Sequence, residues 1–358
     1  MADVWFVIVC VLLVGYVVLD GFDFGAGVLH RIVARTDAQR REVIAAIGPF
    51  WDGNEVFLLA AGGALFLAFS RVLAVGLSGL YLAVMLVLWG ILLRGISLEL
   101  RSHLRDSMWR SFWDVVFQLA SGLLALLLGV ALGCVLRGFP LGEDGYFGLE
   151  LFSFESPTRG LGVIDAYTLF TGLFALLLIT QHGGRFLAMR TRGEVAARSK
   201  SVAQRLTVPV AIAWVVVTGL TYVFARPAAA TFADRPWAWP LVPIAAGALY
   251  LGWYFGRSEA AGRAFLASCA AIVALLGIAA TSMYPVLLRS TTDAPALDVT
   301  NAASPDTTLG LGLRWWFFAF ALVVGYFVNL ARIHRGPATP YGEGGDHDAE
   351  EPSAAHHE

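Results

Sequence analysis

Two short segments of this sequence place carboxylates inside stretches that are otherwise apolar enough to cross a membrane. "LDGFDFGAG" carries Asp20 and Asp23, and "GPFWDGNEVFLLAAGG" carries Asp52 and Glu55. The members of each pair are three residues apart, so they share a face of a helix. An ionisable group at membrane depth costs about 3 kcal/mol or more and indicates a function by default. The chemistry indicated is proton transfer, because chains of buried carboxylates form proton relays.

The depth of the second pair follows from counting along its segment. Arg71 marks one end of the apolar stretch, and residues 56–69 are free of charge. They form about 21 Å of helix, which is too short for a hydrocarbon core of about 30 Å. We therefore expect Asp52 and Glu55 to lie within the membrane, near its cytoplasmic edge.

Each pair also has a simpler interpretation. Gly48 and Pro49 begin the second segment, and a carboxylate in a first helical turn complements the positive end of the helix dipole. The dipole accounts for Asp52, but less well for Asn54 and Glu55. The first pair could instead lie at a frayed helix end and bind a nearby arginine.

A third apolar segment, "WGILLRGISLEL", supplies a possible counter-ion, Arg94. It could pair with a carboxylate of another helix, or it could be an arginine that snorkels to the cytoplasmic surface. The first interpretation predicts one cluster that admits protons from the cytoplasm. Its ionisable members would be Asp20, Asp23, Asp52, Glu55 and Arg94.

Other polar residues near helix ends indicate function less strongly. Asp114 is interpreted mainly as a partner of a helix dipole. His30 and His182 could bind a haem, but each lies close to an arginine, and we expect hydrogen-bonded histidines at the membrane interface. The three cysteines are expected to be buried small hydrophobic residues.

The elements that position these groups are membrane helices. The chain has 358 residues, of which 58% are hydrophobic and only 15% charged, and its mean hydropathy is +0.69. This composition excludes an ordinary soluble domain, and the net charge of −2 does not indicate a nucleic-acid partner. A membrane span needs about 20 mostly apolar residues. Nine stretches qualify: 4–24, 49–69, 72–93, 112–136, 161–182, 206–225, 237–255, 264–287 and 314–333.

The basic residues predict the orientation of these nine spans. Of the 25 Lys and Arg residues, 18 fall on one side and 7 on the other. The positive-inside rule then predicts an N-terminus outside and a C-terminus in the cytoplasm. The first span lacks the basic start of a cleavable signal, so we expect it to be retained.

Two connections predict short interfacial helices. Residues 36–47 begin with a capping box of Thr36 and Gln39, and residues 191–205 would begin with a box of Thr191 and Glu194. The outer segment near residues 290–308 is expected to be irregular, and the polar tail beyond Gly336 to be disordered.

The segments "GYVVLDGFDFGAGVL", "IGPFWDGNEVFLLAAGG", "LYLAVMLVLWGILLRGISLELRS" and "LLITQHGGRFLAMRTRGEV" resemble subunit II of cytochrome bd-type quinol oxidases. The resemblance is strongest over residues 1–205 and extends to about 335. It implies an all-α fold of nine transmembrane helices, with two four-helix bundles and one peripheral helix. The expected parts are a first bundle (1–136), an outer loop (137–160), a second bundle (161–287), an outer segment with the ninth helix (288–335) and a disordered tail (336–358).

The resemblance also implies a function in a bacterial or archaeal cell membrane. Such subunits pair with a homologous subunit I that carries haem b, haem d and the quinol-binding loop. The complex oxidises quinol, reduces dioxygen to water and is electrogenic. Subunit II itself would hold no haem, although a structural quinone or lipid and a small single-helix subunit are possible companions. The family's proton-path positions fall on Asp23, Trp51, Asp52 and Arg94, and Asp20, Asn54 and Glu55 belong to the same motifs.

Two other functions compete with this one. A proton-coupled secondary transporter would place a substrate site at the membrane midplane, often at broken helices. A purely structural subunit would use its buried acids only to hold a partner. The position of the polar cluster near one membrane surface favours the oxidase over the transporter.

Overall fold

The computed structural model describes residues 1–153, 161–334 and 336–338, and most of this part is helical. Within it, eight helices are long and apolar enough to cross a membrane, or nine if the bent pair at residues 37–68 forms one span. This confirms an all-α polytopic membrane protein. The helices are α1 (Ala2–Val33), α2 (Asp37–Ile47), α3 (Trp51–Ala68), α4 (Ser70–Gly79), α5 (Tyr81–Leu100), α6 (Ser107–Arg137), α7 (Ala166–Arg190), α8 (Gly193–Arg205), α9 (Thr207–Phe224), α10 (Arg226–Ala233), α11 (Leu241–Arg257), α12 (Ala261–Met283) and α13 (Asp306–Ile333).

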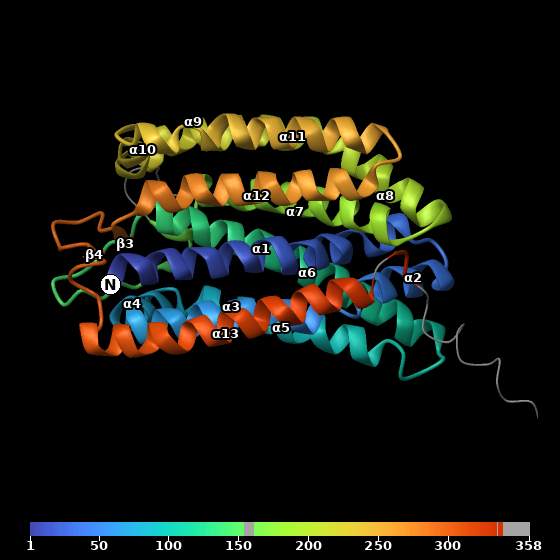
Figure 1. The fold of residues 1–358 in the computed structure, drawn as a ribbon, viewed down its shortest axis with the longest axis horizontal. Coiled ribbons are helices and arrows are strands. Elements are labelled where there is room, and N and C mark those ends of the chain that lie inside the picture. The colour runs from blue at the N-terminus through green and yellow to red at the C-terminus, as the bar shows by residue number, and fades with distance from the viewer. Residues whose placement is uncertain (154–160, 335, 339–358) are drawn as a thin grey trace, which may run out of the picture.

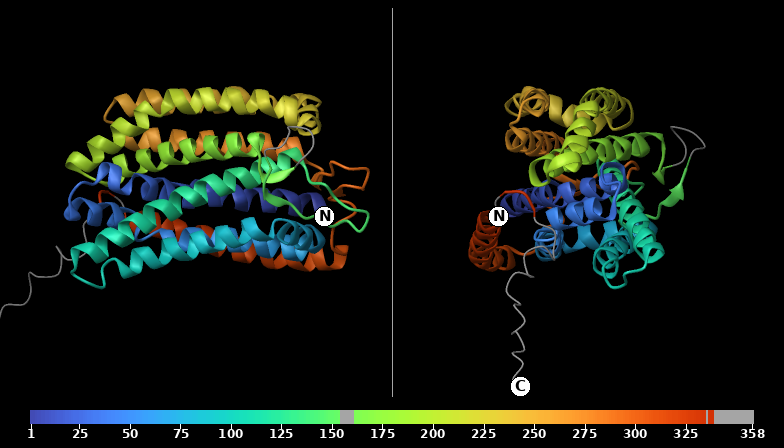
Figure 2. Two further views of the ribbon diagram at one scale, coloured as in Figure 1. Left: turned by 180° about the vertical axis from the view of Figure 1, so that it is seen from behind. Right: turned by 90° about the vertical axis from the view of Figure 1, so that its right-hand side faces the viewer.

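The long helices lie side by side in two bundles (Figure 1). α1 packs against α3 and α6, and α5 packs against α6, which forms the first bundle. α7 packs against α9 and α12, and α11 packs against α12, which forms the second. α13 lies at the edge of the molecule, where it touches α3 and α1 (Figure 2). The arrangement is therefore two four-helix bundles plus one peripheral helix.

The two bundles meet where α1 crosses α7. A Cβ atom on Gly25 would lie 2.1 Å from the carbonyl oxygen of Ile179, and one on Gly183 would lie 2.3 Å from the backbone of Gly25. Gly27 has a similar relation to α6, because its Cβ would lie 2.0 Å from the Oγ of Ser121. Small residues let membrane helices approach closely. The glycines after Asp20 thus let α1 pack closely against α6 of its own bundle and against α7 of the second bundle.

The start of α1 also meets the start of α13, although the two are at opposite ends of the chain. The indole Nε1 of Trp5 donates to the carbonyl oxygen of Leu309, 3.1 Å away. A Cβ on Gly312 would lie 3.0 Å from the Trp5 ring. Trp5 is buried by this contact.

Some helix boundaries differ from the prediction. The third span was expected at 72–93, but the chain breaks at Leu80 into α4 and the longer α5. The residues on both sides of the break are apolar, so hydropathy alone does not reveal it. The fifth span starts at Ala166 rather than 161, because Asp165 caps the helix and receives a hydrogen bond from the backbone of Thr168. α1 continues past 24 to Val33.

The short helices α2 and α8 exist as predicted, but only one has its predicted cap. Thr36 and Gln39 form the capping box of α2. The box predicted for α8 is wrong, because its N-cap position is Arg192, without a side-chain cap. The Thr191 hydroxyl donates instead to the carbonyl of Leu187.

Small sheets occupy the end of the molecule opposite α2 and α8 (Figure 1). They pair β1 (Glu150–Phe152) with β2 (Gly162–Ile164) in parallel, and β3 (Val286–Leu288) with β4 (Leu297–Asp298) in antiparallel orientation. A 3-10 turn, η1, covers Pro236–Ala238. Most of the predicted disordered tail, and part of the outer loop, lie outside the described residues.

Candidate functional site

Arg94 of α5 is the centre of a polar cluster between three helices of the first bundle. Its side chain is fully buried, and it donates from Nη1 to Asp20 of α1 and from Nη2 to Glu55 of α3. The two distances are 2.6 and 2.5 Å. Asp20 is fully buried, whereas the Glu55 side chain is 23% exposed. The planar guanidinium suits this role, because its fork can bind two carboxylates at once.

A second contact extends the cluster by one turn of α1. The amide Nδ2 of Asn54 donates to Asp23 over 2.7 Å and to the carbonyl of Leu19 over 3.2 Å. Asn54 and Asp23 are both fully buried. Asp20 and Asp23 therefore lie on the same face of α1, as their spacing predicts, and both contact α3 or α5.

The charges of this cluster do not balance if every group is ionised. Asp20, Asp23 and Glu55 share the single positive charge of Arg94, which also lies 4.7 Å from the centre of the Phe24 ring. A buried charge without a partner is strongly unfavourable. A set of three carboxyl groups around one guanidinium is therefore suited to hold and release a proton.

Asp52 and Trp51 lie at the edge of this arrangement. The side chain of Asp52 is exposed on the isolated chain and makes no hydrogen bond or ion pair in the described part of it, unlike the burial we expected. The helix period explains the difference: Asp52 is two residues before Asn54, or about 200° around α3, so it faces away from α1. Trp51 is half-buried, and its ring lies 3.5 Å from the position of a Cβ on Gly95.

A second ionic cluster was not recognised in the sequence. The carboxylate of Asp114 in α6 receives hydrogen bonds from Arg101 and Arg40, at 2.6 and 3.0 Å, and it is 2.6 Å from the Nε2 of His30. The interpretation of Asp114 as a helix-dipole partner is wrong, because α6 begins two turns earlier, at Ser107. The sequence carries one sign of this second cluster. His30 lies seven residues, or two helical turns, after Asp23, so both side chains lie on the same polar face of α1.

This second cluster continues to Asp37, at the start of α2. Arg101 donates to Asp37 over 2.8 Å, and Arg110 and Arg41 lie at 3.1 and 3.2 Å. Partial burial would favour the neutral acid, but the hydrogen bond and the charges of these three arginines hold the pKa of Asp37 below its ordinary value. The cluster ties α1, α2, α5 and α6 together at one end of the bundle.

The histidine of the second bundle is hydrogen-bonded through both ring nitrogens. His182 Nδ1 lies 2.7 Å from the hydroxyl of Ser268, and Nε2 lies 2.9 Å from the carbonyl of Val18. Neither nitrogen is left for an axial bond to a haem iron. The side chain is fully buried between α7, α12 and α1, and it is hydrogen-bonded as expected. Within the described residues, no group of three or more His, Cys, Asp or Glu side chains is placed to hold a metal ion.

Comparisons with known proteins agree with this architecture. The family model for cytochrome bd terminal oxidase subunit II matches residues 1–334. The cytochrome bd ubiquinol oxidase subunit 2 of Bacillus subtilis (strain 168) is 31% identical over 348 residues, which cover 94% of this chain and 98% of that protein. The cytochrome bd-I ubiquinol oxidase subunit 2 of Escherichia coli (strain K12) is 38% identical over 201 residues, 56% of this chain and 52% of the relative.

A solved structure shares the fold. The structure of bd oxidase from Geobacillus thermodenitrificans contains a chain that superposes with a TM-score of 0.74 at 17% identity. The match covers 93% of the present chain and 98% of that one. The family model covers nearly the whole chain, and the alignment with the Bacillus subtilis protein spans nearly the full length of both chains. Both findings confirm the resemblance found in the sequence. The chain belongs to the cytochrome bd terminal oxidase subunit II family.

Proposed function

We propose that this chain works as one subunit of a cytochrome bd-type quinol oxidase in a bacterial or archaeal cell membrane. Its partner would be the haem-bearing subunit I, with haem b and haem d. A small single-helix subunit and a structural quinone or lipid would be further companions. Within the complex, this chain would take up protons from the cytoplasm and support the partner. The buried cluster of Arg94, Asp20, Asp23, Asn54 and Glu55 carries the proposal.

The need for protons follows from the reaction. Reduction of dioxygen to water consumes a proton for every electron, and haem supplies the electron transfer and the oxygen chemistry. An electron that enters a low-dielectric site favours the uptake of a compensating positive charge, because Coulomb energies are large there. Protons taken from the cytoplasm, while quinol releases its own outside, make the reaction electrogenic.

The buried and the exposed residues of this chain would have different roles in proton transfer. Asp23 and Asp20 would hold protons inside the bundle, where Arg94 supplies the opposite charge and Asn54 fixes one carboxylate. Buried polar atoms normally bind protein or ordered water. One carboxylate oxygen of each of these aspartates has no partner among the described residues, so water can continue the chain there.

Asp52 would act at the surface of the same helix. Its exposed side chain faces away from α1. In this proposal it would pass protons from the interior cluster to a surface that the partner subunit would cover. Trp51, next to it, packs toward α5 near Arg94. The order from Asp23 to Asp52 and onward to the partner is part of the proposal.

A purely structural role is the competing proposal, because the same ion pairs also tie three helices together. A proton-coupled transporter is less favoured, because the buried polar residues of the described chain bind one another and leave no open substrate site among them.

The experiment that tests the proposal is purification of the native complex from membranes. We expect a larger haem-bearing subunit to co-purify, with reduced-minus-oxidised bands of haem b and haem d. Proton uptake on oxygenation would then be measured in the wild type and in Asp52→Asn. A colourless protein that purifies alone would contradict the oxidase function. An assembled variant with normal uptake would contradict the proton path.

A further inference from the structure

One buried arginine of the second bundle has no anionic partner. Arg185 of α7 is only 3% exposed, yet neither Nη1 nor Nη2 makes a hydrogen bond within the described residues. The other buried arginines of the described chain each bind a carboxylate or a carbonyl oxygen: Arg94, Arg101, Arg137 and Arg190. A buried charge without a partner is strongly unfavourable, so the exception calls for an anion.

The neighbouring helix is shaped to receive this guanidinium. A Cβ on Gly252 of α11 would lie 2.5 Å from Nη1 of Arg185 and 2.8 Å from Nη2. One turn further, a Cβ on Gly256 would lie 1.8 Å from the amide of Gln204, which donates to the carbonyl of Trp253. The side chains of Arg185 and Gln204 thus pack directly against the backbone of α11, at its glycine positions 252 and 256.

Arg185 is one of the residues that line a small, partly enclosed cavity. The cavity, of about 20 Å³, is lined by Arg185 together with Lys200, Gln204, Ser258 and Ala261. Its volume is enough for about one water molecule or one oxygen atom of a larger group. A wider surface pocket of about 660 Å³ adjoins it, shares Ser258 and Ala261, and is lined by the loop from Ser258 to Arg263 and by Met189.

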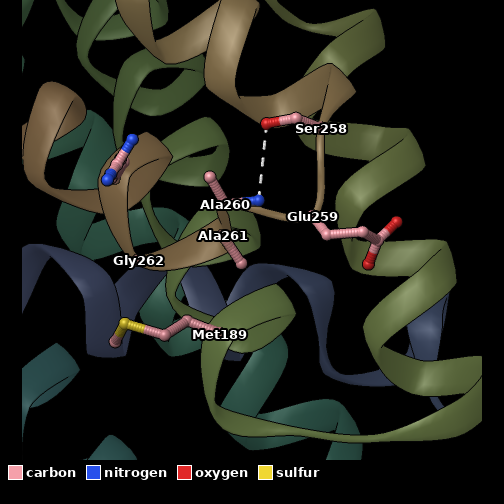
Figure 3. Close-up of a pocket in the computed structure, with 7 residues that line it drawn as sticks. Met189, Ser258, Glu259, Ala260, Ala261 and Gly262 are labelled. Carbon is pink, nitrogen blue, oxygen red and sulfur yellow. Dashed lines mark hydrogen bonds between the residues drawn. The ribbon is translucent and has the colours of Figure 1, made fainter.

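The surface pocket is built on the beginning of α12. Figure 3 shows Met189 opposite the loop from Ser258 to Gly262. In this loop the backbone N–H of Ala260 donates a hydrogen bond to the Ser258 hydroxyl. No side chain of the described residues caps α12, so the N–H groups of its first turn are suited to bind an anion. Figure 3 also shows the Glu259 side chain directed away from Met189.

The charges around the two cavities favour an anion with several oxygen atoms. Arg185, Lys200 and Arg263 are cationic, and the one acidic residue among the linings is Glu259. Glu259 is fully exposed and lies 3.3 Å from Lys200, so it neutralises little of the charge at Arg185. Phosphate fits this set, because guanidinium and helix N-termini both bind its oxygens.

We propose that this cleft between α7, α8, α11 and α12 binds a phosphate group, whether of a phospholipid headgroup or free in solution. One phosphate oxygen reaches Arg185 through the small cavity, and the other oxygens meet the start of α12 and Lys200. Basic pockets between membrane helices are known to hold lipid headgroups. The exposed side chains of Tyr254 and Leu266, on the adjoining helices, offer an apolar surface for acyl chains.

Native mass spectrometry and thermal unfolding of the purified complex would test this site. We expect wild-type protein to keep one phospholipid-sized adduct through mild delipidation, and Arg185→Gln to lose it. The matched control is Arg257→Gln. Arg257 ends α11, close in sequence to Gly252 and Gly256, and its guanidinium carbon lies 4.2 Å from the centre of the Trp253 ring. It lines neither cavity.

Inorganic phosphate would distinguish the two sources. If the ligand is free phosphate, no lipid adduct is found, but millimolar phosphate raises the Tm of the wild type and not that of Arg185→Gln. If Arg185→Gln fails to assemble, Lys200→Gln replaces it, with an expected loss of phosphate affinity of about tenfold. Neither adduct nor phosphate effect in the wild type, or equal binding in the variants, would overturn the proposal.

Discussion

Arg94→Gln is the substitution that separates the structural role of the buried cluster from a role in proton transfer. It removes the positive charge that Asp20 and Glu55 share, at distances of 2.6 and 2.5 Å. Removing one partner of a buried ion pair costs about 3–5 kcal/mol, because the other charge stays buried. The Glu55 side chain is 23% exposed and can turn toward water, so most of the cost falls on Asp20.

The expected result is a less stable protein. A loss of about 3–5 kcal/mol corresponds to a Tm that is lower by roughly 4–7 °C in a chain of this size. The assay is thermal unfolding of the purified complex, with Arg257→Gln as a matched control that removes an arginine outside the cluster. We expect the control to change Tm by no more than about 1 °C. A Tm for Arg94→Gln equal to that of the control would refute the reasoning about buried charge.

The double variant Asp20→Asn with Arg94→Gln tests the second role. Two neutral amides replace the fully buried Arg94–Asp20 pair, and the 23% exposed Glu55 can turn toward water, so part of the lost stability should return. If the cluster carries protons, oxidase turnover should remain at least about tenfold below the wild type, because a titratable group is missing. Recovery of both stability and turnover would show that the cluster is only a scaffold.

The other predictions test separate parts of the structure. Asp52→Asn should slow turnover while the complex still assembles, because its exposed side chain makes no ion pair in the described chain; normal turnover and proton uptake would count against its role. Gly25→Ala should lower Tm by several degrees or prevent assembly, because the new Cβ would lie 2.1 Å from a carbonyl oxygen, whereas Gly62→Ala, with nothing within 4 Å, should be neutral. Asp37→Asn should lower the free energy of unfolding at neutral pH. The folded-state pKa of Asp37 lies below its ordinary value. The difference in free energy of unfolding between variant and wild type should therefore shrink as pH falls from the ordinary pKa through the folded-state pKa. Urea titration at a series of pH values measures this difference in free energy of unfolding. A difference that does not change with pH would argue against a stabilising role of the Asp37 ion pairs.

Much of the fold was predictable because apolar length and charge placement are local properties of the chain. The nine expected spans agree with the eight or nine that the described residues contain. The break at Leu80 was not predictable in this way, because it separates two apolar helices. The missing cap at Thr191 shows a similar limit, since the residue types fit a capping box and only the backbone geometry excludes it.

The polar cluster was predictable in most of its members, Asp52 excepted, but not in its geometry. Spacing placed Asp20 and Asp23 on one face of α1, and both lie in the cluster. The direction of Asp52 depends on which face of α3 meets α1, and spacing within α3 cannot decide that. Two partners of Asp114, His30 and Arg40, lie 84 and 74 residues away, so the face shared by His30 and Asp23 hints at a polar contact but does not identify Asp114.

The hydrogen bond between Trp5 and Leu309 has a consequence for how the protein is made. The two residues are 304 positions apart, and ribosomes add about 5–20 residues per second. The start of α1 therefore waits on the order of 15 s to 1 min for its last neighbour. Asp20, by contrast, is only 74 positions from Arg94, so the two can meet about four times sooner. The buried charges are matched early during insertion, and the indole of the first helix is covered only when translation is nearly complete.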